Sequence, residues 1–367
     1  MLRSAFLLCL ALYFSLLPIA AQTRANCGPW VTAVGNDCFT VCWITSQTSA
    51  GAVRLDSGIT FYESGHAGKL SGRLHNVKVT GLKPGSSYSY SIPAFSPGTF
   101  STRTLDPRKK NCRFVMFNDV HEADGLMKDE IDAGSITSDS CDFVLFNGDM
   151  TSRVDSIGDI VNFMLPSCQT FAGSVPIFTA RGNHECRGIY ASEYLDFFPT
   201  SNGKYYYTFR EGPVFFIVLD GGDNVKDKDL KKSHNHLTYN YFRKAEADWL
   251  KKVVASEDYL DAPHRVVVLH MPPETNRQWE GREMVKDFAS ILNGTHVDLM
   301  VCGHEHEHLY YPAGSEESGC DFPVFVNDIH ARADIKVTPK KIEISARKNK
   351  HKIKFEGVSD DDSDDGE

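Results

Sequence analysis

The sequence predicts a two-domain protein, an all-β sandwich followed by an α/β domain. Two observations support this prediction. Residues 27–104 contain short segments in which apolar and polar side chains alternate, with turn residues between them and no helical period. From residue 113 to about 355, apolar runs are separated by longer helical stretches, which is typical of buried strands that alternate with helices.

The strands of the first domain follow from period-two patterns. Residues 38–45 and 75–79 alternate, and the second run leads into the turn sequence G-L-K-P-G at 81–85. Residues 106–111 are polar and contain a proline, so we place the domain boundary there. The expected core strands of the second domain are residues 114–117, 143–146, 177–180, 214–219, 265–269 and 299–301. Residues 245–256 have the spacing of a packing helix.

The two ends of the chain differ from both domains. Residues 1–21 combine a basic start, an apolar run and small residues, which is the pattern of a cleaved export signal. The apolar run is shorter than the roughly 20 residues that span a bilayer. We therefore expect an exported protein (periplasmic, cell-surface or extracellular) with no membrane span after cleavage. Residues 356–367 are strongly acidic and are expected to form a disordered tail.

Composition narrows the function classes. The chain is 41% hydrophobic and 24% charged, as in soluble globular proteins, and its net charge of -9 argues against a dedicated nucleic-acid binder. Nine of the ten cysteines lie beyond the export signal, so at least one stays unpaired, and none has C-x-x-C spacing. The sequence selects no disulfide and indicates no oligomeric state.

Five motifs with carboxylate, amide or imidazole groups follow predicted strands. They are D-V-H at 119–121, G-D at 148–149, G-N-H-E at 182–185, His270, and G-H-E-H at 303–306. Ligands bind beyond the carboxyl ends of strands in open α/β sheets, and alternate residues of an extended segment face the same way. Each motif alone is weak, but five in order predict one metal site.

This order of motifs resembles the calcineurin-like metallophosphoesterase superfamily over about residues 113–330. The resemblance implies a four-layer α/β/β/α catalytic domain. The G-L-K-P-G turn and the following Y-S-Y at 88–90 resemble fibronectin type III modules, in particular the sandwich that precedes the catalytic domain of purple acid phosphatases.

The resemblance also implies roles for seven metal ligands. Asp119, His121 and His306 would hold a first ion, Asn183, His270 and His304 a second, and Asp149 would bridge both. Two ions about 3.5–4 Å apart can share a hydroxide that acts as the nucleophile and can clamp phosphate oxygens. Mixed imidazole and carboxylate ligands suit Mn, Fe, Zn, Co or Ni better than Mg or Ca.

One departure separates the site from purple acid phosphatases, which have Gly at the position of His121 and Tyr at that of Ser152. The site therefore resembles the wider D-x-H branch, which includes protein phosphatases and cyclic-nucleotide phosphodiesterases. We predict a protein without a tyrosinate-to-iron absorption band.

Two further residues are candidates for catalysis. His184 matches the family's general acid, or it hydrogen-bonds the phosphate. Ser152 replaces the carboxylate that orients this histidine in protein-phosphatase relatives, so either another carboxylate serves, with Asp124 and Glu185 as candidates, or the pKa of the histidine is tuned differently. Arg153 has the spacing of a phosphate-binding arginine, although a solvated arginine is the alternative. The polar insertion 221–240 is either a surface loop or a lid.

We expect a phosphomonoesterase that acts on a small phosphorylated substrate. The alternative is a phosphodiesterase that acts on cyclic nucleotides, nucleic-acid ends or phospholipid headgroups. A third hypothesis is a surface binding module with an idle metal site, which the complete ligand set argues against.

Overall fold

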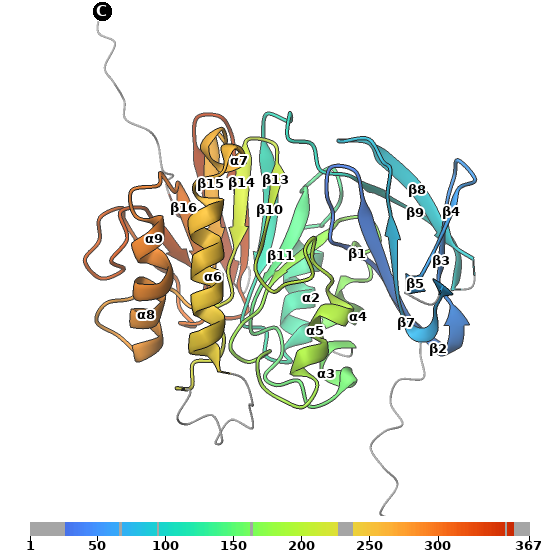
Figure 1. Cartoon of the computed structure of the whole chain (residues 1–367), viewed down its shortest axis with the longest axis horizontal. Helices are drawn as coiled ribbons and strands as arrows, with labels where there is room; N and C mark the ends of the chain where they lie inside the picture. Colours follow the sequence, from blue (N-terminus) through green and yellow to red (C-terminus); the bar gives the residue numbers. More distant parts are fainter. Residues whose placement is uncertain are drawn as a thin grey trace, which may run out of the picture.

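The computed structural model describes residues 26–65, 68–93, 95–161, 164–226, 238–348 and 351–355. The predicted export signal and acidic tail lie outside these residues. The predicted fold class is confirmed, because an N-terminal β-sandwich is followed by an α/β domain with two mixed sheets (Figure 1). No helix in the described part of the chain is long and apolar enough to cross a membrane.

The sandwich consists of two antiparallel sheets that face each other across buried aromatic and β-branched side chains such as Trp43, Val77 and Tyr90. One sheet has the order β1 (Cys27–Thr32), β2 (Phe39–Ala50) and β7 (Ser71–Val79). The other has the order β4 (Thr60–Tyr62), β3 (Ala52–Leu55), β8 (Ser87–Ile92) and β9 (Ser96–Arg103). A short hairpin pairs β5 (Ser64–Gly65) with β6 (Gly68–Lys69).

The α/β domain has two six-stranded sheets. The first has the order β12 (Ile177–Ala180), β11 (Phe143–Asn147), β10 (Cys112–Phe117), β19 (Arg332–Val337), β20 (Ile342–Lys348) and β21 (His351–Phe355). The second has the order β13 (Tyr207–Glu211), β14 (Val214–Val218), β15 (His264–Val268), β16 (Leu299–Cys302), β18 (Val324–Val326) and β17 (Leu309–Tyr311). The six apolar runs expected as core strands form β10, β11, β12, β14, β15 and β16.

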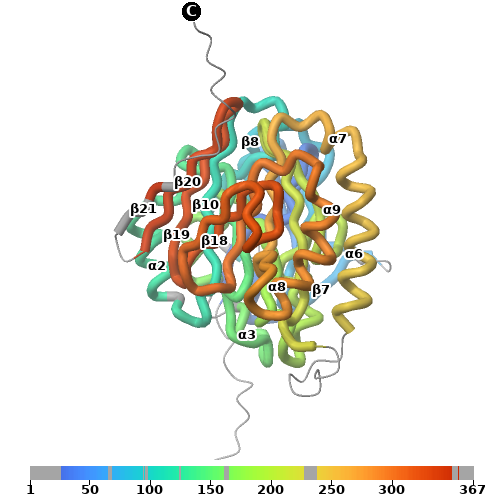
Figure 2. Tube along the Cα trace, turned by 90° about the vertical axis from the view of Figure 1, so that its left-hand side faces the viewer, coloured from blue at the N-terminus to red at the C-terminus, as the bar shows by residue number. Residues whose placement is uncertain are grey.

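Helices cover the outer face of each sheet. Beside the first sheet lie α2 (Asp124–Ala133), α3 (Ile157–Val161), α4 (Met164–Cys168), η1 (Ala191–Glu193) and α5 (Tyr194–Phe197). Beside the second lie α6 (Tyr239–Val253), α7 (Glu257–Leu260), α8 (Trp279–Met284), η3 (Val285–Ala289) and α9 (Ser290–Leu292). Figure 2 shows α2 and α6 on opposite sides of the strands. The domain therefore has the four layers that the resemblance implied.

The inner faces of the two sheets share one core. Phe143 of β11 stacks on Phe114 at a ring distance of 5.0 Å and meets Phe216 of β14 edge-on at 5.3 Å. Rings of this size interdigitate across the layers and exclude water, which fixes the two sheets relative to each other. The loops at the carboxyl ends of strands in both sheets are thus held over one common region.

The sandwich packs against the first sheet's helical side. The buried Trp30 donates from its indole nitrogen to the backbone oxygen of Phe197 at 2.8 Å, and the Tyr90 hydroxyl donates to that of Gly173 at 2.7 Å. We keep 27–104 and 113–355 as the proposed domain division. The cysteines of the described chain are free thiols, at positions 27, 38, 42, 112, 141, 168, 186, 302 and 320.

Candidate metal centre

The predicted ligands come from five strand ends that the fold brings together. Three sets of ligand atoms each lie within 4.8 Å of one another, which is close enough to hold a metal ion. The sets are Asp119 with His121 and His306, Asp149 with His270 and His304, and His121 with Asp149 and His184. Because His121 and Asp149 each belong to two of these sets, the three sets form one continuous cluster.

The backbone at these residues is strained. Five of them have a positive φ: Asp119 (49°), His121 (45°), Asp149 (52°), His304 (74°) and His306 (57°). This region costs a side-chain-bearing residue on the order of 1 kcal/mol or more, so it persists only where the surroundings enforce it. The clustering of strain at the strand ends that carry ligands is typical of a functional site.

Glycines let the loops approach the two carboxylates. A Cβ on Gly182 would lie 2.2 Å from Oδ1 of Asp149, and a Cβ on Gly303 would lie 2.6 Å from Oδ2 of Asp119. Both distances are far below van der Waals contact. The glycine of the G-N-H-E and G-H-E-H motifs is therefore required by the packing of the loop against the neighbouring aspartate.

Each of the two aspartates has one oxygen held by backbone and one turned to imidazoles. Oδ2 of Asp119 accepts from the His304 amide at 2.8 Å, while its buried Oδ1 has no donor and lies 3.3 Å from Nε2 of His306. Oδ1 of Asp149 accepts from the His184 amide at 2.8 Å. Oδ2 of Asp149 lies 3.1 Å from Nε2 of His270 and 4.0 Å from Nε2 of His121. Asp149 thus lies between the two groups.

The orientation of the imidazoles leaves ring nitrogens free at the centre. Nδ1 of His270 donates to the backbone oxygen of Asn147 at 2.7 Å, which leaves Nε2 as the ligand atom. Nδ1 of His121 lies 3.3 Å from the hydroxyl oxygen of Ser152. The Nε2 atoms of both rings are buried without a hydrogen-bond partner among the described residues. Buried polar atoms without partners are costly, and a metal ion would satisfy them.

Asn183 adds an amide to the second group. One of its amide atoms lies 3.0 Å from Nδ1 of His304 and 3.2 Å from Oδ2 of Asp149. If this group holds a cation, this atom would be the oxygen and would be one of the ligands, together with His304 and Asp149. Without a cation, it is the nitrogen, which donates to both neighbours. The mixed oxygen and imidazole set fits a transition-metal ion.

Electrostatics favour positive charge here. Burial alone would raise the pKa of Asp119, but the charge of His270 and the close imidazoles of His121 and His306 hold this pKa well below its usual value. Burial opposes a charged His270 as well, yet Asp149 and Asp119 raise its pKa to about 10. The two buried carboxylates therefore attract a cation strongly.

In the described structure a backbone carbonyl orients His184, which agrees with the alternative that no carboxylate serves. Its Nδ1 lies 2.7 Å from the backbone oxygen of Ser152, and its Nε2 lies 3.9 Å from Oδ2 of Asp149. Glu185 instead accepts from the amides of Gly182, Asp149 and Met150 at 3.0, 2.9 and 2.7 Å. Burial and the neighbouring Asp149 raise the pKa of Glu185 to about 7. Glu185 supports the ligand loops, and the side chain of Asp124 lies outside the described residues.

The structure places a different arginine at the centre from the one predicted. Nε of Arg153 donates to Asp155 at 2.6 Å, and no contact joins it to the candidate ligands among the described residues. Arg187 lies with Nη1 3.2 Å from Nε2 of His184 and is anchored by Asp223 at 3.1 Å and Asn224 at 2.6 Å. Arg187 was not among the residues predicted from the sequence, although it follows the G-N-H-E motif by two residues.

The predicted insertion 221–240 is described at its two ends only, so its role as loop or lid stays a prediction. At its start, Asp223 is fully buried and the backbone oxygen of Asn224 accepts from the indole nitrogen of Trp279 at 3.1 Å. These contacts make residues 221–226 part of the wall beside Arg187.

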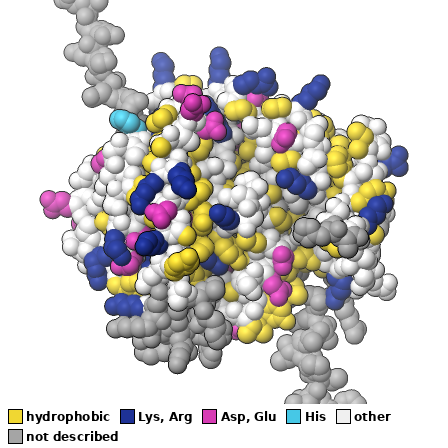
Figure 3. All heavy atoms as spheres, viewed as in Figure 1, with side chains coloured by type: hydrophobic (Ala, Val, Ile, Leu, Met, Phe, Trp, Pro, Cys, Tyr) yellow, Lys and Arg dark blue, Asp and Glu magenta, His cyan; other side chains and the backbone are white. Residues whose placement is uncertain are grey.

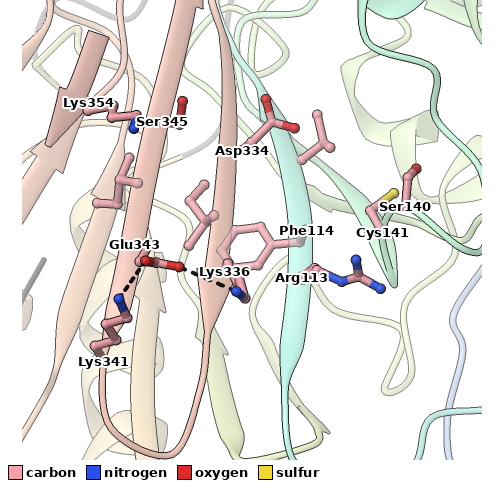
Figure 4. A pocket seen from close by; sticks show the side chains of 13 residues that line it. Arg113, Phe114, Ser140, Cys141, Asp334, Lys336, Lys341, Glu343, Ser345 and Lys354 are labelled. Carbon is pink, nitrogen blue, oxygen red and sulfur yellow. Dashed lines mark ion pairs between the residues drawn. The ribbon is translucent and has the colours of Figure 1, made fainter. Parts of the chain in front are cut away.

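A separate cavity of about 680 Å³ lies on the first sheet, over β10, β19 and β20 (Figure 4). None of the candidate site residues lines it. Three of its charged groups pair with each other, since Glu343 lies 2.7 Å from Lys341 and 3.5 Å from Lys336. On the face drawn in Figure 3, basic side chains are scattered among acidic ones and do not form a continuous stripe. Neither feature competes with the strand-end cluster as a catalytic site.

The family model for calcineurin-like phosphoesterases matches residues 112–308, more than half of the 367-residue chain. The chain belongs to this family. The match contains all seven candidate ligands of this calcineurin-like phosphoesterase, and it confirms the resemblance that the five motifs indicated.

Curated relatives come from Arabidopsis thaliana. Purple acid phosphatase 21 is 25% identical over 251 residues, covering 64% of this chain and 53% of the relative. Purple acid phosphatase 22 is 26% identical over 259 residues, with the same two coverages. The chain spans about half the length of the curated relatives it matches.

Two solved structures share the fold. The purple acid phosphatase PPD1 from yellow lupin (Lupinus luteus) seeds superposes with a TM-score of 0.63 at 14% identity, covering 91% of this chain and 74% of that one. PhoD superposes with a TM-score of 0.62 at 12% identity, covering 89% of this chain and 88% of that one. At these identities the likeness concerns the fold alone, including the sandwich in front of the catalytic domain.

Proposed function

We propose that this calcineurin-like phosphoesterase is a dinuclear-metal-dependent phosphomonoesterase. The observation that supports this most directly is the position of Asp149, whose Oδ2 faces His270 of one ligand group and His121 of the other. A carboxylate between two groups is what a pair of ions needs as a bridge.

The ligand assignment follows the two groups. Asp119, His121 and His306 would hold the first ion, and Asn183, His270 and His304 the second, with Asp149 shared. Mn, Fe, Zn, Co and Ni all suit these ligands. When bound, the ions would supply Lewis acidity and lower the pKa of a water molecule toward neutrality.

The chain's own residues would then bind the phosphate and protonate the leaving group. Arg187 offers a planar guanidinium beside the centre. Asp223 and Asn224 hold it in place but accept from only some of its N–H groups, so others can donate to a phosphate. Nε2 of His184 faces the same side. Because Nδ1 already carries the proton that it donates to Ser152, the ring acts as a general acid only as the doubly protonated imidazolium, which would give its Nε2 proton to the departing alcohol oxygen and leave neutral His184. Because Nδ1 of His184 donates to a fixed carbonyl, the ring is held for that task.

The pair of Arg187 and His184 favours a monoester as substrate, because a phosphate monoester carries up to two negative charges that two such donors can match. A diester carries one. Phosphodiesterase activity on cyclic nucleotides, nucleic-acid ends or phospholipid headgroups is the alternative, and an idle binding module is the third hypothesis.

Turnover of p-nitrophenyl phosphate and of bis-p-nitrophenyl phosphate, with Mn, Zn, Ni and Fe supplied in turn, separates these hypotheses. We expect faster cleavage of the monoester and a loss of activity in Asp149→Ala. Cleavage of the diester alone would favour a phosphodiesterase. If the intact protein is as inactive as Asp149→Ala on both substrates, the idle binding module becomes the better hypothesis.

We also propose that the protein is exported after removal of residues 1–21, and that its natural substrate is a small phosphorylated compound met outside the cytoplasm. The pattern of those residues supports export.

A further inference from the structure

Glu280, near the start of α8, is a buried carboxylate without hydrogen bonds. It is 3% exposed, and both of its carboxylate oxygens lack a partner among the described residues. Other buried acids in the described chain, such as Asp223 and Glu246, leave one oxygen without a partner, whereas Glu280 leaves two. The sequence predicted no role for Glu280.

Such a carboxylate is costly unless something satisfies it. Removing an ionised group from water carries a penalty of several kcal/mol, which proteins offset with a donor or a cation. The imidazole of His304 is the one basic side chain of the described structure that pairs with Glu280 within 4.0 Å, with Nε2 3.8 Å from Oε1. His304 is one of the candidate ligands of the second ion.

The two nitrogens of this imidazole face different groups. Nδ1 of His304 lies 3.0 Å from the Asn183 amide atom that also faces Asp149, so it belongs to the ligand group. Nε2 points to Glu280 instead. A neutral imidazole carries a proton on one nitrogen only, and a nitrogen that binds a metal must be the other one.

We propose that Glu280 is a positioning residue for His304. In the metal-bound protein, Oε1 of Glu280 would accept a hydrogen bond from Nε2–H of His304, which would leave Nδ1 as the nitrogen that binds the second ion. This inference rests on the proposed dinuclear site. A carboxylate behind a ligand histidine fixes the ring and makes the imidazole a stronger ligand, and removal of such partners typically weakens metal binding by about 10- to 100-fold.

Another histidine of the same group provides an internal comparison. Nδ1 of His270 donates to the backbone oxygen of Asn147 at 2.7 Å, so that histidine is already held by a neutral carbonyl. The 3.8 Å between His304 and Glu280 is longer than a hydrogen bond, and a shift of about 1 Å closes it. We expect this contact to close when an ion binds at Nδ1 of His304.

The backbone around Glu280 is held firmly enough for this role. The Glu274 amide donates to the backbone oxygen of Gly281 at 3.2 Å. A Cβ on Gly281 would lie 2.9 Å from Cβ of Glu274, so glycine permits this close approach of α8 to the segment that follows His270. The start of α8 is thereby fixed relative to the strand end that supplies another ligand of the same ion.

The test compares Glu280→Ala and Glu280→Gln with Glu283→Gln. Glu283 lies on the same helix and pairs with Lys286 at 3.2 Å, so this variant removes the same charge away from the site. The readouts are metal stoichiometry and affinity by chelator competition, and the visible spectrum of the Co²⁺-loaded protein. Thermal unfolding of each metal-free protein verifies that it is folded.

We expect Glu280→Ala to bind one of its two ions about 10- to 100-fold more weakly, with the other ion unchanged and the Co²⁺ spectrum altered. Glu280→Gln keeps an acceptor oxygen and should recover part of the loss, and Glu283→Gln should match the wild type. Wild-type affinity for both ions in Glu280→Ala would overturn the inference alone. A wild-type protein that fails to bind two ions would overturn the proposed function as well.

Discussion

Nδ1 of His184 lies 2.7 Å from the backbone oxygen of Ser152, and not beside a side-chain carboxylate, which was one of the two alternatives that the sequence left open. A carbonyl accepts only, so the ring donates from Nδ1 and turns Nε2 to the metal centre. Arg187 lies 3.2 Å from that Nε2 and 3.4 Å from Nδ1, which places the two candidate substrate-binding groups together.

The first prediction concerns His184. We expect His184→Asn to lower kcat for p-nitrophenyl phosphate by about 10²- to 10⁴-fold, because a positioned general acid contributes that much to the rate. The metal content should stay at the wild-type value, since His184 is outside the proposed ligand set. Steady-state kinetics and metal analysis on one sample measure both. An unchanged kcat would remove His184 from the reaction.

The second prediction compares two arginines. Arg187→Ala should raise KM for p-nitrophenyl phosphate and weaken inhibition by inorganic phosphate by about tenfold or more, as expected for the loss of a charge-assisted hydrogen bond. Arg153→Ala should leave both nearly unchanged, because Arg153 pairs with the partly exposed Asp155. If Arg153→Ala has the larger effect, then Arg153 binds the phosphate, as the sequence predicted, and Arg187 does not.

These residues show which parts of the site the sequence can reveal. Asp119, Asp149 and His270 directly follow apolar strands, and parallel strand ends meet at one edge, so their convergence could be predicted. Glu280 lies on a helix whose approach to the site depends on packing, and Arg187, although it follows the G-N-H-E motif by two residues, lies on a loop whose direction depends on packing as well. Every residue has a backbone carbonyl, so no residue type in the sequence could identify that of Ser152 as the partner of His184.

The sandwich illustrates the same limit. Alternation in residues 38–45 predicted β2 directly. The contact of Trp30 with the backbone of Phe197 joins residues 167 positions apart, and no local pattern encodes such a pair. Periodicity therefore predicts the elements, while the docking of one domain on the other depends on shape complementarity.

The third prediction concerns colour. Ser152 occupies the position of the iron-binding tyrosine of purple acid phosphatases, and its hydroxyl lies 3.3 Å from Nδ1 of His121. Iron-loaded protein should therefore lack the strong visible tyrosinate-to-iron band. An absorption spectrum of the reconstituted protein measures this, with apo-protein as the blank. A strong band that survives His121→Ala would show that a tyrosine binds the iron after all.

The fourth prediction concerns stability and pH. Glu246 on α6 is fully buried beside Arg181, which already pairs with Asp220 at 2.7 Å. Burial and then the charge of Asp220 raise the pKa of Glu246 well above its usual value. The folded state thus holds a proton that the unfolded chain releases above about pH 4.5. The free energy of unfolding should therefore fall as the pH rises from about 4.5 toward the raised pKa of Glu246 in the folded state.

Glu246→Gln replaces the buried carboxyl group by a neutral amide and so removes this loss of stability at higher pH. The new side chain keeps an oxygen that can accept the hydrogen bond which the backbone N–H of Asp220 donates to Glu246 at 2.8 Å in the wild type. Its stability relative to the wild type should increase from pH 5 to pH 8, by about 1.4 kcal/mol for each tenfold difference in the acid constant. Denaturant unfolding at several pH values measures this. Asp248→Asn, on the exposed side of α6, is the control and should show no such trend. A constant difference for Glu246→Gln would mean that Glu246 is ionised throughout.

The central claim is that Asp149 joins two metal sites, and the number of ions bound per chain tests it most directly. Metal analysis after reconstitution and removal of free ions should give two ions per chain for the wild type and at most one for Asp149→Ala. Two tightly bound ions in Asp149→Ala, or a single ion in the wild type, would contradict the dinuclear centre.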